Sequence, residues 1–148
     1  MGRRAVRIVL LVLGVALAAC GSEASGDGTA SPPSRGTATV TLDVFSGVPN
    51  PTWVLDADQA AEFLSQWDDL SVGTPIDYPA ILGYRAMVVD FANRSRIWVT
   101  NGVAVEDGPD GAFGRSDPGR ALELWLLETG SGEVDQALLD SVRLDISG

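Results

Sequence analysis

The 148-residue sequence contains no histidine and no lysine, and its only cysteine is Cys20. Without histidine there can be no Ser-His-Asp triad and no histidine general base. Without lysine there can be no Schiff base and no phosphate-binding lysine of the P-loop type. Zinc and transition-metal sites built from cysteine and histidine are excluded as well. We therefore predict no catalytic residue and no cofactor.

Positive charge is also scarce in this chain. Ten arginines stand against twenty acidic residues, and the formal net charge is −10. Three of those arginines precede Cys20 and all of the acidic residues follow it. Because nucleic-acid binding depends on cationic neutralisation of phosphates, we predict no nucleic-acid partner. Anionic lipid headgroups would repel such a surface too.

The first twenty residues have the pattern of an export signal. Arg3, Arg4 and Arg7 form a basic head, and an apolar stretch from Ile8 leads to small residues before Cys20. This order is typical of a secretory signal. The apolar stretch is shorter than the about 20 residues of a membrane-spanning helix. Arg3 and Arg4 also fit a twin-arginine signal, but no neighbouring residue supports it, and we treat them as part of the basic head.

The segment Leu17-Ala18-Ala19-Cys20 resembles the lipobox of bacterial lipoproteins. The resemblance implies that the chain is cut before Cys20 and that its sulfur carries a diacylglyceryl group. Two or more acyl chains anchor a protein stably. The expected location is therefore the cell membrane, with the protein lipid-anchored and facing the extracytoplasmic side. The alternative is an ordinary cleaved signal followed by a free cysteine.

Composition divides the chain into three parts. We predict a lipoprotein signal peptide over 1–19, a flexible tether over 20–38 and a folded domain over 39–148. The tether consists mainly of Gly, Ser, Ala, Thr and Pro, and such a segment cannot offset its ordering entropy by burying apolar groups. The remaining roughly 110 residues suffice for one domain with one core.

Periodicity and turn signals predict an α+β domain. Asp56 and Gln59 form a capping box ahead of a helical stripe that contains Ala60, Phe63 and Trp67. Two more helices are predicted, one opened by Asp117-Pro118 and ended by Gly130 and a shorter one over 133–139. Strands are predicted over 39–44, 84–91, 96–100, 103–106 and 142–146. The segments 71–82 and 107–116 are predicted to be loops.

The pair Asn101-Gly102 predicts a type I′ hairpin turn that sets Trp98 opposite Val105. We expect a single small domain in which a mostly antiparallel sheet of about four to five strands carries two to three helices on one face. The last strand is placed beside the first. Trp67 and Trp125 are predicted to lie in the core.

A stiff proline-containing loop follows the first predicted strand. The residues before each proline are restrained to extended geometry, and the loop ends in a large aromatic side chain. A preformed recognition loop is one interpretation; a core position for the aromatic is the other, and the one we favour. The candidate contact residues are Val48, Pro49, Asn50, Pro51 and Trp53, with Tyr84 and Arg85 from a second segment.

Three motifs together resemble a family of small exported actinobacterial proteins without assigned activity. They are Ser46-Gly47-x-Pro49-Asn50-Pro51-x-Trp53, Leu82-Gly83-Tyr84-Arg85 and Leu122-Glu123-x-Trp125-Leu126-Leu127. Val48 stands where that family pattern has an arginine, and Ala86-Met87 stand where it has a glycine-aromatic pair. The resemblance implies no mechanism.

Two weaker site interpretations concern metal and sugar. Glu106, Asp107 and Asp110 form an acidic loop with oxygen ligands, but their spacing does not fit the twelve-residue calcium loop, and turn chemistry explains the loop equally well. Trp53 and Trp98 are a candidate stacking platform for a sugar, although large aromatics are usually buried.

The sequence therefore predicts a membrane-anchored extracytoplasmic lipoprotein that acts as a non-catalytic binding or accessory module. Its expected partners are the membrane, through the lipid anchor, and an envelope protein or glycan. One alternative is a carboxylate-dependent cell-envelope hydrolase, since paired carboxylates can cleave glycosides. The other is an inhibitor that presents the Pro49-Asn50-Pro51 loop to a partner enzyme.

Overall fold

The computed structural model describes residues 36–94 and 96–148. The predicted signal peptide, Cys20 and nearly all of the predicted tether lie outside the described residues. The elements are β1 (Ala38–Asp43), β2 (Thr52–Leu55), α1 (Ala57–Asp69), β3 (Ser71–Gly73), β4 (Ala86–Phe91), β5 (Ile97–Thr100), β6 (Val103–Gly108), β7 (Gly111–Ser116), the 3-10 helix η1 (Pro118–Arg120), α2 (Ala121–Thr129) and α3 (Gln136–Ser147). In this part of the chain no helix is long and apolar enough to span a membrane.

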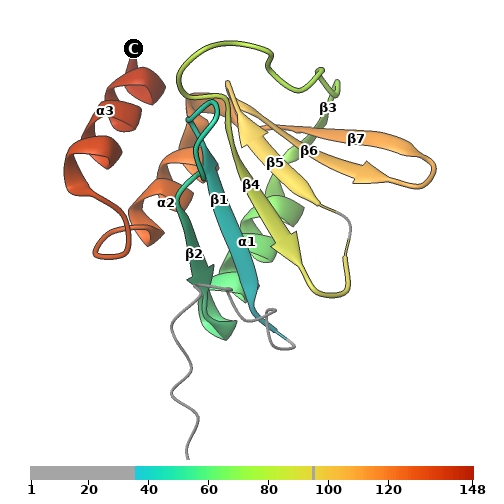
Figure 1. Cartoon of the computed structure of the whole chain (residues 1–148). Coiled ribbons are helices and arrows are strands. Elements are labelled where there is room, and N and C mark those ends of the chain that lie inside the picture. Colours follow the sequence, from blue (N-terminus) through green and yellow to red (C-terminus); the bar gives the residue numbers. More distant parts are fainter. Residues whose placement is uncertain (1–35, 95) are drawn as a thin grey trace, which may run out of the picture. The chain divides into compact units, whose positions relative to one another are not determined.

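The strands form one antiparallel sheet in the order β2-β1-β4-β5-β6-β7-β3 (Figure 1). With three α-helices beside it, the predicted α+β class is confirmed. The sheet has seven strands, more than the four to five that the sequence predicted. The strands that the sequence did not predict are β2, β3 and β7. They are short or lie next to prolines and glycines, so they show no clear alternation of apolar and polar residues.

The three helices share one face of the sheet with its main apolar core. The capping box predicted at the start of α1 is present, with Asp56 accepting from the Gln59 amide and Gln59 accepting from the Asp56 amide. Trp125 is partly buried against this core, whereas Trp67 is fully buried within it. The core joins β1, β4 and β5 to all three helices through Val40, Leu42, Met87, Val89, Val99, Phe63, Trp67, Leu122, Leu126, Leu139 and Val142.

The predicted hairpin is confirmed residue by residue. Asn101 and Gly102 both have positive φ, 49° and 74°, as a type I′ turn requires. Trp98 pairs with Val105 as predicted. These two side chains belong to a second, smaller cluster, whereas Val99 belongs to the main core on the opposite face. The turn therefore fixed which face each side chain occupies.

The predicted C-terminal strand over 142–146 is wrong, because these residues lie within α3. Val142, Leu144 and Ile146 alternate in the sequence, which is why they resemble a strand. The structure buries Leu139, Val142 and Ile146 at helical spacing and leaves Leu144 exposed. The neighbours of β1 are β2 and β4, not a last strand.

The predicted loop over 107–116 is also wrong, since it supplies the end of β6 and all of β7. Its Gly-Ala-Phe-Gly-Arg-Ser sequence lacks apolar alternation, and pairing with β6 over six residue pairs determines its conformation instead. The other unpredicted strands are β2, which follows Pro51, and the three-residue β3 at the sheet edge.

The segment 74–84, here called the strap, runs from β3 to β4 past one end of the sheet (Figure 1). It also contacts Trp98 of the smaller cluster, on the face opposite the helices. Its Tyr78 ring packs edge-on against Trp98, with ring centroids 5.1 Å apart. Its Pro75 lies directly over Gly114 of β7, where an added Cβ would come within 2.5 Å of the proline nitrogen. Within the described residues no backbone–backbone hydrogen bond fixes the strap. It is held instead by contacts that involve side chains, among them the Tyr78 ring on Trp98 and the Arg85 guanidinium near the Ile81 carbonyl.

Candidate functional site

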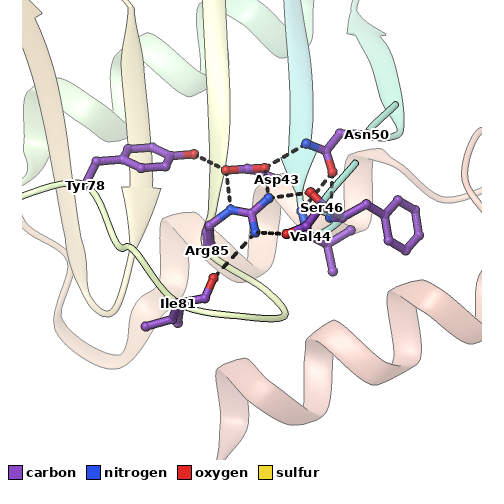
Figure 2. Close-up of polar contacts among 8 residues, drawn as sticks. Asp43, Val44, Ser46, Asn50, Tyr78, Ile81 and Arg85 are labelled. Carbon is purple, nitrogen blue, oxygen red and sulfur yellow. Dashed lines mark hydrogen bonds and ion pairs between the residues drawn. The ribbon is translucent and has the colours of Figure 1, made fainter. Parts of the chain in front are cut away.

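The candidate site is built around an ion pair between the end of β1 and the start of β4. Asp43 is the last residue of β1, and it stands opposite Ala86 in the antiparallel register. Arg85 precedes Ala86, and its backbone amide donates to the Asp43 carbonyl at 2.8 Å. Its side chain forms a bidentate pair, with Nε to Oδ2 at 2.8 Å and Nη2 to Oδ1 at 2.5 Å (Figure 2). Both side chains are largely buried.

Two further side chains complete the hydrogen bonding of Asp43 (Figure 2). Asn50 Nδ2 donates to Oδ1 at 2.7 Å, and the Tyr78 hydroxyl donates to Oδ2 at 2.7 Å. Each carboxylate oxygen therefore accepts two hydrogen bonds. The Asn50 Oδ1 atom faces the other way and accepts from the backbone amides of Val44 and Phe45 at 3.0 and 2.8 Å.

The remaining donors of Arg85 connect two exposed loops. Nη2 donates to the Phe45 carbonyl at 2.6 Å. Nη1 lies 3.4 Å from Ser46 Oγ and 3.5 Å from the Ile81 carbonyl. One guanidinium thus joins the turn after β1 to the end of the strap. We call residues 45–49 and 80–83 the two-loop tip; every residue in these two runs is exposed.

The surroundings of Asp43 and Tyr78 favour the charged form of Asp43 and the neutral form of Tyr78. Hydrogen bonding to Arg85 lowers the pKa of Asp43 below its ordinary value of 3.8, against an opposing effect of burial. Burial raises the pKa of Tyr78 well above its ordinary value of 10.0, and the bond to Asp43 raises it further. Near neutral pH Asp43 is therefore an acceptor and Tyr78 a donor in this network.

A second polar cluster is buried beneath the first. The Tyr84 hydroxyl donates to Glu123 Oε1 at 2.5 Å. Arg120 pairs with both oxygens of Glu123, at 2.7 and 2.8 Å, and its Nη1 donates to the carbonyls of Asp145 and Ile146 near the end of α3. Because Glu123 is fully buried, no substrate reaches its carboxylate. The cluster ties α2 and α3 to the start of β4.

Asp117 caps α2 across the 3-10 turn. Its side chain is buried and accepts from the amides of Leu122 and Glu123 at 3.1 and 3.2 Å. The helix predicted to open at Asp117-Pro118 begins later, because Arg120 is the N-cap of α2 and Pro118 lies in η1. The Asp117 carboxylate nevertheless accepts from the amides of the second and third residues of α2, as the side chain of an N-cap does.

The residues predicted as a binding loop separate into exposed and buried groups. Val48 and Pro49 are exposed, whereas Asn50 and Pro51 are half-buried. Trp53 lies in the core, with its Nε1 donating to Thr129 Oγ1 at 2.9 Å. The core position favoured for Trp53 from the sequence is therefore the observed one.

Of the two residues predicted from the second segment, Tyr84 is buried in the core and Arg85 joins the network around Asp43. Tyr84 and Trp53 therefore cannot contact a partner. The Arg85 side chain is itself largely buried, but it contacts the exposed loop residues Phe45, Ser46 and Ile81.

The sugar platform predicted from Trp53 and Trp98 is wrong. The two side chains are only 4% and 3% exposed. They also belong to different clusters, Trp53 with the helices and Trp98 beneath the strap. Neither ring offers a face to solvent on which a sugar could stack.

The acidic loop does not assemble a cation site. Glu106 is held by Arg94, with Nε to Oε1 at 2.9 Å and Nη2 to Oε2 at 3.0 Å. Asp107 lies on β6, and Asp110 lies in the turn that joins β6 to β7. Among the residues of 36–94 and 96–148, no three acidic side chains gather as metal ligands.

Sequence reasoning missed Asp43, Tyr78 and the apolar residues of the strap. Asp43 ended a predicted strand and carried no sign of a specific partner, because Tyr78 lies 35 residues away and Arg85 lies 42 residues away. One available signal was the absence of charge between Asp43 and Asp56 and between Asp77 and Arg85, in a chain with a net charge of −10.

Comparison of the chain with protein-family models, with curated proteins and with solved structures found no match. The resemblances to lipoproteins and to an exported actinobacterial family therefore stay predictions from the sequence.

Proposed function

We propose that this protein is a lipid-anchored extracytoplasmic lipoprotein whose folded domain is a non-catalytic binding or accessory module. The observation that carries the binding role is the network around Asp43. Its polar atoms bond to one another, and by doing so they fix two exposed loops. Binding residues are often placed on loops that a rigid scaffold positions.

Catalysis by this network is disfavoured by its own hydrogen bonding. A carboxylate that acts as a base or nucleophile needs a lone pair free for the substrate. Both oxygens of Asp43 already accept two bonds each from protein donors. Glu123, the other carboxylate in a buried cluster with a tyrosine, is closed off from solvent.

The two alternative functions have less support. The hydrolase requires two carboxylates that flank a substrate at separations of about 5 to 10 Å, and Asp43 and Glu123 are instead each paired to an arginine. The inhibitor requires Pro49 to Pro51 to project. Asn50 turns its side chain inward, and the Pro51 carbonyl accepts from the Leu42 amide at 3.0 Å.

The location is tested with the Cys20→Ser variant of the full chain. We expect the wild-type protein to fractionate with membranes and to incorporate an alkyne-labelled fatty acid, and we expect the variant to do neither. Protease added outside intact protoplasts should digest the wild-type domain. An unmodified thiol at Cys20 in the mature protein would contradict the proposed anchor.

The binding role is tested with the chain from residue 20 onward, carrying Cys20→Ser, as bait in an envelope extract. We expect the bait to retain a specific partner and expect Arg85→Gln to lose it, because this change releases the two loops. Identical captures by the two forms would count against the role. Turnover of an envelope glycan or peptide that Asp43→Asn abolishes would contradict the non-catalytic proposal.

A further inference from the structure

The strap covers a second apolar surface of the sheet, which is the smaller cluster on the face opposite the main core. Pro75 lies against Gly114 of β7. The Tyr78 ring packs on Trp98 of β5, and the Tyr78 hydroxyl donates to Asp43 of β1. The strap thus has contacts on three strands of the sheet. Beneath it, the buried members of the cluster are at most 8% exposed, and they are Ala86, Val88, Trp98 and Val105.

Val105 of β6 lies between two residues that the strap contacts. It pairs with Trp98 on one side and with Gly114 on the other. The Tyr78 ring packs on the first of these residues, and the Pro75 backbone lies against the second. Val105 is 0% exposed. The strap therefore passes over Val105 and shields it from solvent.

The strap has few interactions of its own to hold it closed. In 74–83 only Pro79 is half-buried, and the other residues are exposed. Within the described part of the chain, this segment makes no backbone–backbone hydrogen bond. Tyr78 is its one side chain there with a hydrogen bond or a ring contact. A segment with few buried contacts and an unbonded backbone opens at a lower free energy than the whole domain.

Release of Tyr78 leaves the rest of the Asp43 network in place. Asp43 loses the hydrogen bond from the Tyr78 hydroxyl but keeps two from Arg85 and one from Asn50. The Tyr78 side chain is already 41% exposed, so water has access to it. The strand pairings of the sheet involve no residue of 74–83. Opening therefore disturbs neither the ion pair nor the sheet.

We infer that the strap is a lid. Residues 75–80 lift from the sheet while the strands and helices stay folded, and Val88, Trp98 and Val105 become exposed to solvent. The closed form prevails because it buries these apolar side chains. The opening needs no ligand and does not depend on the binding role proposed above.

The opening is measured by thiol labelling of a cysteine placed under the strap. The full chain carries Cys20→Ser, so the introduced cysteine is its only one. Val105→Cys places the thiol under the strap, and Val99→Cys places it in the main core as the matched control. Both valines are 0% exposed. Each labelling rate is measured where it is proportional to reagent concentration, and it is divided by the rate of the same variant unfolded in urea.

We expect the Val105→Cys thiol to react at least about 100-fold faster than the Val99→Cys thiol, because only the second needs the whole domain to unfold. Low concentrations of urea should hardly change the first rate, since opening of the strap exposes little surface, and should raise the second steeply. Val89→Cys, also in the main core, replaces Val99→Cys if that variant does not fold. Equal rates with the same urea dependence would overturn the lid.

Two further substitutions distinguish the strap from the core. Tyr78→Ala should speed labelling of Val105→Cys at least about fivefold, because it removes the ring contact and the hydrogen bond of the closed form. Asp77→Ala, at the exposed neighbour, should leave that rate within about twofold. Val142→Ala should speed labelling of Val99→Cys at least about fivefold and leave Val105→Cys within about twofold, since Val142 stays packed in the main core when the strap opens. Unchanged labelling in Tyr78→Ala, or equal acceleration of both thiols by Val142→Ala, would overturn the inference.

Discussion

Arg85 and Asp43 meet through three hydrogen bonds, one between their backbones and two between their side chains. The pair joins the end of β1 to the start of β4, which are neighbours in the sheet but 42 residues apart in the chain. Because the same guanidinium also holds the Phe45 carbonyl and approaches Ile81, one ion pair determines the geometry of both exposed loops.

Replacing Asp43 by Asn should weaken the pH dependence of the free energy of unfolding. In the folded protein the pKa of Asp43 is below its ordinary value of 3.8, so the folded state favours the charged form. The carboxylate therefore stabilises the fold above the unfolded pKa, and this contribution is lost as pH falls through the folded pKa. We expect Asp43→Asn to cost about 1–3 kcal/mol at neutral pH, and we expect the difference from wild type to shrink below about pH 4.

Urea unfolding monitored by tryptophan fluorescence at several pH values measures this difference. Asp69→Asn, an exposed position at the end of α1, serves as the control and should give a difference near zero at each pH. A wild-type advantage over Asp43→Asn that stays constant down to the lowest pH would contradict the assigned role of the charge.

Trp53 should behave as a core residue and not as a contact residue. Trp53→Phe removes the hydrogen bond from Nε1 to Thr129 and should cost about 1–2 kcal/mol in the free energy of unfolding. Trp53→Ala should cost about 3–5 kcal/mol, because it also leaves a cavity. The neighbouring exposed residue Val54 is the control, and Val54→Ala should stay within about 0.5 kcal/mol. Equal stability of wild type and Trp53→Phe would contradict this assignment.

Gly114→Ala should lift the strap from the sheet. A Cβ at this position would lie 2.5 Å from the nitrogen and 2.7 Å from the Cα of Pro75, both of which are backbone atoms. We expect a loss of about 1–3 kcal/mol from overpacking, together with altered Trp98 fluorescence as Tyr78 moves away. Gly108→Ala is the matched control, since its Cβ would meet only the Gly111 carbonyl, at 3.4 Å. Similar unfolding curves for the two variants would contradict tight packing of the strap.

Arg120→Gln should loosen α3 selectively. Arg120 donates to the carbonyls of Asp145 and Ile146 while it pairs with the buried Glu123. Its backbone is left-handed, with φ 57°, a conformation that costs energy outside glycine. Hydrogen exchange followed by mass spectrometry should show at least about tenfold faster exchange in α3, with β4 and β5 unchanged. Unaltered protection of α3 would count against the anchoring role of Arg120.

The features that the sequence predicted correctly depend on neighbours in the chain. The capping box of Asp56 and Gln59 and the turn at Asn101-Gly102 each require only residues a few positions apart. The two failures have different causes. β7 pairs with β6 across the two-residue turn Pro109-Asp110, but its sequence lacks the apolar alternation that predicts a strand. α3 is a helix whose Leu139, Val142 and Ile146 pack into a core made largely of distant residues.

The candidate site was predicted only in part because its residues are distant in the chain. Arg85 and Asn50 were named from motifs, but their common partner Asp43 could not be identified without the register of β1 on β4. The sequence alone shows that the chain has no histidine and no lysine, and that 44–55 and 78–84 carry no charged residue. Only the structure shows that the charge-free runs 45–49 and 80–83 both lie beside the Arg85 guanidinium.

The most direct test of the central claim, that the Asp43–Arg85 pair holds the two-loop tip rigid, is the backbone ¹⁵N order parameter of residues 45–48 and 80–83 in the soluble domain. We predict values near those of β1, about 0.85, in the wild type, and values below about 0.6 in Arg85→Gln, with β1 itself unchanged. Mobile loops in the wild type, or equally rigid loops in Arg85→Gln, would contradict the claim.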